Sequence, residues 1–342
     1  MLQHMLRAAG GGSTYTLAVA LEATPYVRAY RFSSTKGFGA AYSNPGTLPT
    51  DVGNGIAFTS DGTAIAVAHN TSPYVSAYPW SGGGFGSKFS NPATGVGDDG
   101  NAIAFSDANN AVAIAIASTP YINVYAWSGS GFGSKFSNPA TLPTGIGNGV
   151  AFTADDSAIA VAHTTSPYIS VYPWSGSGFG SKFSNPATLP TGTGASVAFS
   201  PDGAAIAVGH STSPYVSVYP WSGSGFGSKF SNPASLPAGT AQGIAFSPDS
   251  TALAVAHVNF PYISAYPWSG SGFGTKFANP ATRPIDDGYG VAFSPDGLSL
   301  AVANLFAPGI TAYPWSASGF GTKFANPTTG SSNCRAIAFG VI

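Results

Sequence analysis

A unit of about 47 residues recurs seven times along this chain, and one copy is divided between the two ends. Each copy carries an Ala-Phe dipeptide, with its phenylalanine at Phe58, Phe105, Phe152, Phe199, Phe246, Phe293 or Phe339. A second marker, Pro-Tyr, stands at Pro25, Pro73, Pro120, Pro167, Pro214 and Pro261, and Pro308 takes its place in the last copy. The first Pro-Tyr has no Ala-Phe before it, and the last Ala-Phe has no such proline after it. Because the end supplies the piece that the start lacks, the repeat predicts a closed ring and not an open stack.

Composition indicates that this ring is built from strands. Among 342 residues there are one glutamate and two methionines, whereas 45 glycines and 27 prolines favour short strands joined by turns. Only 7% of the residues are charged and the net charge is −1, which argues against a general nucleic-acid binder. No apolar run is long enough for a membrane-spanning helix, and a single cysteine, Cys334, permits no internal disulfide.

The fifth unit shows the strand pattern within one repeat. Its segments Ser196–Ser200 and Ala204–Gly209 are apolar and are separated by a Ser-Pro-Asp-Gly turn. The segment Tyr215–Trp221 alternates between two faces, and Phe226–Phe230 forms a fourth, more polar strand. Four strands per unit, repeated seven times, predict an all-β, seven-bladed β-propeller.

Three residue types keep the repeat's spacing, and each permits two interpretations. The tryptophans could stack on sugars, but we expect them to fill the wedges between blades: Trp80, Trp127, Trp174, Trp221, Trp268 and Trp315. The lysines could attract an anionic surface, but are expected to guard the outer edge strands: Lys88, Lys135, Lys182, Lys229, Lys276 and Lys323. The histidines that end the second strands lie one per blade, which favours local hydrogen bonds over a shared metal: His69, His163, His210 and His257.

The string AFSPDGAAIAVGH followed by PYVSVYPW resembles the blades of WD-repeat and YVTN-type propellers, which carry an SPDG turn between their first two strands. Across residues from about 14 to 342, the compound repeat is more similar still to the highly regular repeat proteins of tailed-bacteriophage virions. Tyr-Pro-Trp stands where true WD repeats have Trp-Asp, which puts the WD hydrogen-bonded tetrad in question. The resemblance implies a virion protein of the capsid or tail, assembled in the host cytoplasm.

In such propellers the strands of a blade run from the central channel outward. The first blade, about 14–46 plus 335–342, would then contain Thr14–Ala20, Tyr26–Phe32 and Gly39–Tyr42, with Arg335–Ile342 as its innermost strand. Closing the ring in this way removes the unpaired edges of an open sheet. The propeller domain is thus expected to span residues 14–342, and residues 1–13 to form an arm that either packs on a neighbour through Leu2, Met5 and Leu6 or is frayed.

Departures from the internal repeat indicate where function lies. Blades six, seven and one replace the common His-x-Thr-Ser loop with larger apolar residues, and the adjoining loops gain charge. These blades become neighbours when the ring closes, so we expect either an asymmetric docking site for another virion protein or relaxed drift with the aromatic rings folded inward. The residues of this predicted docking site are Leu21, Phe260, Arg283, Asp286, Asp287, Leu305 and Phe306.

No set of residues in one blade indicates catalysis, so the sequence predicts a non-enzymatic structural or binding protein with no cofactor and no metal. Most carboxylates lie in Ser-Pro-Asp-Gly-type turns, where aspartate forms the turn. The alternative is a carbohydrate-binding propeller that recognises a host-surface glycan through equivalent pockets. The tyrosines of these pockets would be Tyr74, Tyr121, Tyr168, Tyr215 and Tyr262.

Overall fold

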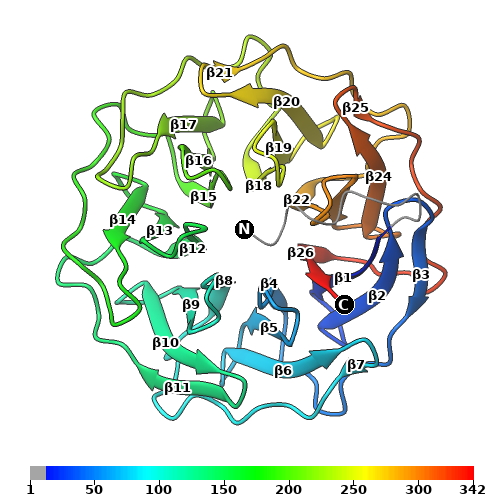
Figure 1. The fold of residues 1–342 in the computed structure, drawn as a ribbon. Coiled ribbons are helices and arrows are strands. Elements are labelled where there is room, and N and C mark those ends of the chain that lie inside the picture. The colour runs from blue at the N-terminus through cyan, green and yellow to red at the C-terminus, as the bar shows by residue number, and fades with distance from the viewer. Residues whose placement is uncertain (1–12) are drawn as a thin grey trace.

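Seven β-sheets surround a central channel in the computed structural model, which describes residues 13–342 (Figure 1). The innermost strands are β26 (Cys334–Val341), β4 (Gly53–Phe58), β8 (Gly100–Phe105), β12 (Gly147–Phe152), β15 (Gly194–Phe199), β18 (Ala241–Phe246) and β22 (Gly288–Phe293). The second strands are β1 (Thr14–Leu21), β5 (Ala64–His69), β9 (Ala111–Ile116), β13 (Ala158–His163), β16 (Ala205–His210), β19 (Ala252–His257) and β23 (Ser299–Asn304). The predicted all-β, seven-bladed propeller is confirmed; the predicted arm lies almost wholly outside the described residues.

The third and fourth strands form the outer part of each blade. The third strands are β2 (Val27–Ser33), β6 (Val75–Ser81), β10 (Ile122–Ser128), β14 (Ile169–Pro173), β17 (Val216–Pro220), β20 (Ile263–Ser269) and β24 (Ile310–Ser316). The fourth strands are β3 (Gly37–Ala41), β7 (Gly84–Phe85), β11 (Gly131–Lys135), β21 (Gly272–Phe273) and β25 (Gly319–Phe320). In blades four and five the fourth strand is reduced to isolated bridges, Trp174 to Phe179 and Trp221 to Phe226.

A proline in the third strand explains why most outer strands are so short. The strand expected at Phe226–Phe230 is reduced to one bridge, and the residue before Trp221 is Pro220. Proline has no N–H to donate to a neighbouring strand. Where Arg31 or Ala126 replaces this proline, in blades one and three, the outer strand reaches five residues.

The C-terminal strand closes the ring as predicted. Strand β26 pairs with β1 in antiparallel register, with Leu17 opposite Phe339 and Val19 opposite Ile337. An aromatic contact closes the same gap farther out, because the ring of Phe32 lies 5.6 Å from Phe324 of blade seven. Backbone pairing and aromatic packing therefore both join the last blade to the first.

The tryptophans fill the wedges between blades, which confirms that prediction. Trp80 is 5% exposed, and its ring centroid lies 4.9 Å from that of Tyr42 in the preceding blade and 5.5 Å from that of Phe58. The other five tryptophans are equally buried and repeat this arrangement with phenylalanines of the preceding blade. Buried rings cannot stack on a sugar, so the alternative interpretation fails.

The four histidines form local hydrogen bonds, as expected. Each is fully buried, and its Nε2 lies 3.0–3.1 Å from the hydroxyl of a serine on the third strand; the pairs are His69–Ser76, His163–Ser170, His210–Ser217 and His257–Ser264. Burial lowers the pKa of all four imidazoles, to about 4 for His163 and His210. Blade seven replaces the pair with Asn304 and Thr311, which hydrogen-bond at 3.1 Å.

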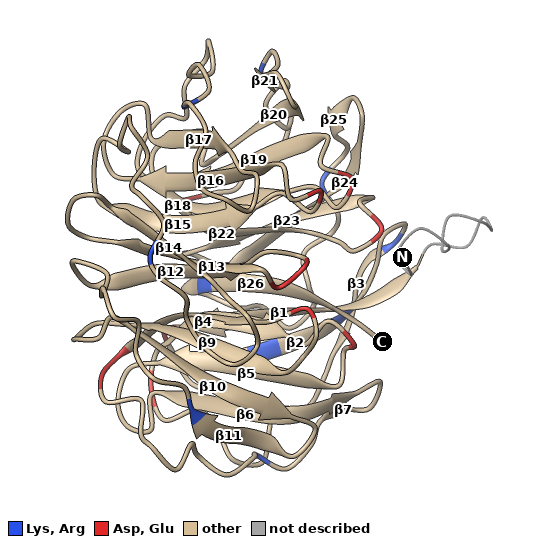
Figure 2. Cartoon of the chain, turned by 60° about the vertical axis from the view of Figure 1, so that its left-hand side comes forward, with Lys and Arg blue, Asp and Glu red and all other residues tan. Residues whose placement is uncertain are grey.

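Charged residues are sparse over the whole ring (Figure 2). Five of the repeated lysines hold the side-chain oxygen of the asparagine three residues later: Lys88, Lys182, Lys229, Lys276 and Lys323. They lie in the outer segments, and their role as edge guards stays a prediction. Within residues 13–342, no helix is long and apolar enough to cross a membrane.

Candidate functional site

The innermost strands begin at one end of the channel, and the second residue of each of these strands differs between blades. Most of the strand is repeated closely, but this position reads Asn54, Asn101, Asn148, Ala195, Gln242, Tyr289 and Arg335 around the ring. A cavity of about 470 Å³ opens there, which we call the polar mouth. It is lined by those seven residues together with Thr193, Ser211 and Thr240. The positions that vary most within the inner strands thus meet in one place.

Three asparagines form a rigid half of the polar mouth. The side-chain nitrogens of Asn54, Asn101 and Asn148 each donate to the carbonyl of the glycine that begins the next inner strand, at 2.9–3.0 Å. Asn54 also donates to the side-chain oxygen of Asn70 at 2.7 Å. The blades of this half are therefore held to one another, with amide groups around the opening.

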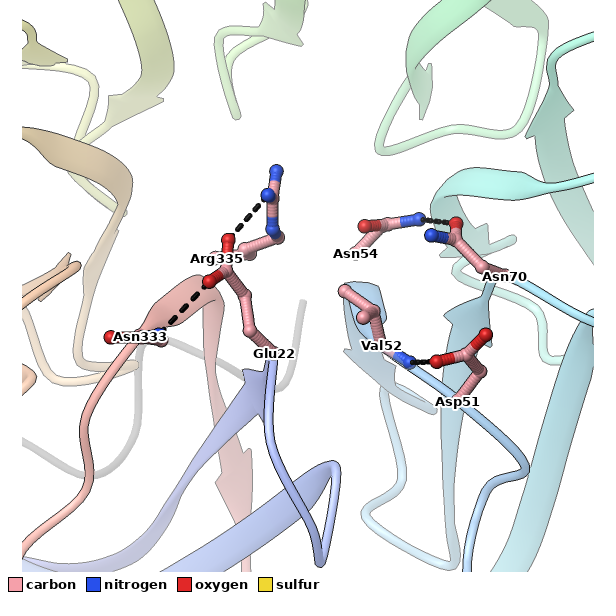
Figure 3. Close-up of polar contacts among 7 residues, drawn as sticks. All are labelled: Glu22, Asp51, Val52, Asn54, Asn70, Asn333 and Arg335. Carbon is pink, nitrogen blue, oxygen red and sulfur yellow. Dashed lines mark hydrogen bonds and ion pairs between the residues drawn. The ribbon is translucent and has the colours of Figure 1, made fainter.

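The opposite half carries the charge of the polar mouth. Glu22 forms an ion pair with Arg335, and its other carboxylate oxygen accepts a hydrogen bond from the side chain of Asn333 at 3.0 Å (Figure 3). The guanidinium carbon of Arg335 lies 5.7 Å from the centre of the Tyr289 ring. Burial raises the pKa of Tyr289, so its hydroxyl is neutral and available as a donor. Among residues 13–342, Arg335 is the one cation that lines the polar mouth.

Only some of the predicted docking residues lie together on the surface of the structure. Phe260 and Phe306 are 60% and 64% exposed, and Arg283 lies over the Phe260 ring at 4.7 Å. Asp287 accepts the backbone N–H of Asn259 at 3.1 Å. The rings do not fold inward, but what they contact stays a prediction.

Leu21 and Leu305 are less exposed than a docking surface requires. Leu21 is 3% exposed in the hydrophobic core, so its assignment to a docking surface is wrong. It pairs with Cys334 at the end of β1 and thus takes the position of the buried histidines, one residue earlier than expected. Leu305 is half-buried, and the backbone carbonyl of Asp286 accepts a bond from Asn304 beside it at 3.3 Å.

The five candidate glycan-binding tyrosines are built into the turns between the second and third strands. The carbonyl of Tyr74 accepts the N–H of His69 at 3.0 Å, and the same bond recurs with Tyr121, Tyr168, Tyr215 and Tyr262. All five side chains are half-buried, and none lines either channel cavity. Their glycan role is untested by this geometry, although their backbone role is clear.

Sequence reasoning missed the polar mouth, although a signal for it was present. The second residue of the inner strands changes from Asn to Ala, Gln, Tyr and Arg within an otherwise regular repeat. The pairing register of the inner and second strands was needed to recognise this position. In blade two, for example, a bulge between Gly53 and Gly55 sets how the start of β4 pairs with β5.

Comparison with known proteins adds information only at the level of the fold. No family model matches the sequence, and no curated protein matches it. Solved structures do match. A protein from Bacteroides fragilis with the provisional name 6-phosphogluconolactonase is 14% identical, with a TM-score of 0.79 over 97% of this chain and 99% of that one. The periplasmic gluconolactonase of Pseudomonas aeruginosa is 16% identical, with a TM-score of 0.70 over 96% and 100%.

These neighbours correct the expectation of a non-enzymatic phage-particle protein. The two matching proteins just described are named as lactonases and align over almost their whole length, and the matches give neither a WD-repeat identity nor a link to phage virions. The hydrazine synthase of Kuenenia stuttgartiensis also matches, at 14% identity and a TM-score of 0.59 over 80% of each chain. At such identities the likeness shows the fold, and the chemistry must be argued from the site.

Proposed function

We propose that this protein is a hydrolase that opens a small, hydroxylated lactone at the polar mouth. One observation carries the proposal: the most variable position of the inner strands lines a single cavity, in which Arg335 is the one cation among the described residues. The names of the neighbouring structures support the choice of a sugar-derived lactone as substrate. The amide and hydroxyl groups around the cavity suit a ligand that is rich in hydroxyl groups.

The reaction needs a group that stabilises negative charge on the lactone carbonyl oxygen. Water adds to the carbonyl carbon, the bond to the ring oxygen breaks, and the product is a hydroxy acid. We assign Arg335 to the developing oxyanion and later to the product carboxylate, since guanidinium donors match both. Glu22 holds the guanidinium in place, Asn333 holds the carboxylate of Glu22, and both act as positioning residues. Gln242 and Tyr289 supply polar contacts to the substrate's hydroxyl groups.

Lactone opening by variants of the polar mouth tests the proposal. The wild-type protein is expected to open glucono-1,5-lactone or its 6-phosphate faster than the spontaneous rate, measured as acid release. Gln242→Ala reproduces the Ala195 of blade five, so the fold should tolerate it, and the loss of a substrate contact should lower kcat/KM roughly tenfold. Arg335→Gln should lower it by roughly 100-fold.

A rim variant and a melting curve separate chemistry from folding. Ser177→Ala changes an exposed outer turn and should leave both rate and melting temperature unchanged. Wild-type rates no higher than the spontaneous rate for both lactones would overturn the proposal, as would an unchanged rate in both mouth variants.

A further inference from the structure

A second cavity, of about 410 Å³, opens at the other end of the channel, where the inner strands end. The Ala-Phe marker of the repeat supplies its walls, and we call it the Phe cavity. Its aromatic residues are Phe58, Phe105, Phe152, Phe199, Phe246 and Phe293. Three prolines (Pro201, Pro248, Pro295) and several hydroxyl groups complete it, together with one carboxylate, Asp107. It lies at the opposite end of the inner strands from the polar mouth and is independent of the function proposed there.

The phenylalanines of the Phe cavity are held firmly. Each lies edge-to-face against the tryptophan of its own blade, with ring centroids 4.9–5.7 Å apart. Phe58, Phe105 and Phe152 are only half-buried, so parts of their rings remain accessible. A ligand would therefore meet a preformed aromatic wall and would not have to order it.

The charge around the Phe cavity has one sign. The turns that follow the inner strands hold seven of the chain's 13 carboxylates and no lysine or arginine: Asp61, Asp107, Asp155, Asp156, Asp202, Asp249 and Asp296. The Asp107 carboxylate makes no hydrogen bond within residues 13–342, and burial followed by the nearby Asp156 raises its pKa. A cation beside Asp107 would relieve both effects.

These features together select the chemistry of a ligand. An anion would be repelled by the carboxylates, and a neutral apolar molecule would gain nothing from them. A small metal ion would gain little from phenylalanine walls, because it requires several oxygen ligands. We propose that the Phe cavity binds an organic ammonium ion with apolar substituents, such as a quaternary ammonium group. Such a cation is attracted to aromatic faces and to carboxylates, and its alkyl groups bury apolar surface.

Choline and its neutral carbon analogue 3,3-dimethylbutan-1-ol test this site, because they share shape and differ in charge. Calorimetric titration of the full chain should give a Kd for choline at least roughly tenfold below that of the neutral alcohol. Asp107→Asn removes the charge that lines the cavity, and it should weaken choline binding severalfold. The change breaks no hydrogen bond of this side chain among residues 13–342, because the carboxylate makes none there. Phe152→Leu keeps an apolar wall but removes the ring, and should also weaken binding.

The matched control lies in the same blade as Asp107, at the opposite end of strand β8. Asp99→Asn changes the same charge near the polar mouth and should leave choline binding unchanged. Equal affinities for choline and the neutral alcohol would overturn the proposal. So would full choline binding by both Asp107→Asn and Phe152→Leu, or a loss in Asp99→Asn as large as that in Asp107→Asn.

Discussion

Deletion of residues 335–342 is expected to leave no soluble, folded ring. These residues form nearly all of β26, which pairs with β1 along its whole length. Without them β1 becomes an unpaired inner edge, and Leu17, Val19 and Phe32 lose apolar partners such as Ile337. The loss of that burial together with the strand pairing is on the order of 5 kcal/mol or more, comparable to the whole stability of many domains.

Solubility, circular dichroism and thermal melting measure this outcome. Removal of Ile342 alone is the matched control, because this residue is 57% exposed and lies outside β26, and it should melt like the wild type. A peptide of residues 334–342 added to the truncated chain should restore part of the folded signal. A soluble truncated protein with unchanged melting would contradict the closure seen in the structure.

Acid is expected to destabilise the ring between pH 6.5 and pH 4, before most carboxylates titrate. The buried histidines have pKa values below the ordinary 6.5, to about 4 for His163 and His210. In this window the unfolded chain binds protons that the folded chain excludes, so stability is complete above pH 6.5 and falls as the pH decreases toward 4. The loss reaches about 3 kcal/mol for each of these two residues, and the other two histidines add to it.

The chain itself supplies the control for this prediction. Replacing each His–Ser pair with the Asn–Thr pair of blade seven removes the titrating group while keeping a hydrogen bond between the same two strands. The variant with all four pairs replaced should have a melting temperature that is nearly independent of pH from 6.5 to 4.5. The reverse change, Asn304→His with Thr311→Ser, should make the stability fall more steeply with acid. Denaturant unfolding at each pH gives the free energies, and identical pH profiles in all three proteins would refute the account.

Much of the fold could be predicted because the sequence of each blade can be aligned with those of six others. The period, the closure by the last strand and the tryptophan wedges all follow from spacing and from the burial of apolar rings. The outer strands were overestimated, although Pro220 and its equivalents carry the signal, since proline cannot donate to a neighbouring strand. The sequence alignment of the blades places Leu21 in the exposed loop, one residue too late; in the structure Leu21 lies at the buried end of β1.

The candidate sites were harder to predict because they depend on which strand ends meet. Gln242, Tyr289 and Arg335 are far apart in sequence, and each looks like a minor variation in its own blade. Only closure of the ring brings them to one opening. The Ala-Phe dipeptides were hard to recognise for the opposite reason. Their regularity indicates a purely structural role, whereas six of the seven phenylalanines also line a cavity.

A structure of the protein with gluconate, the hydroxy acid formed from gluconolactone, tests the central claim most directly. The account predicts electron density for the product in the polar mouth, with its carboxylate on the guanidinium of Arg335 and its hydroxyl groups on Gln242 and Tyr289. Gluconate bound in the Phe cavity or on the outer rim, with the polar mouth empty, would contradict it.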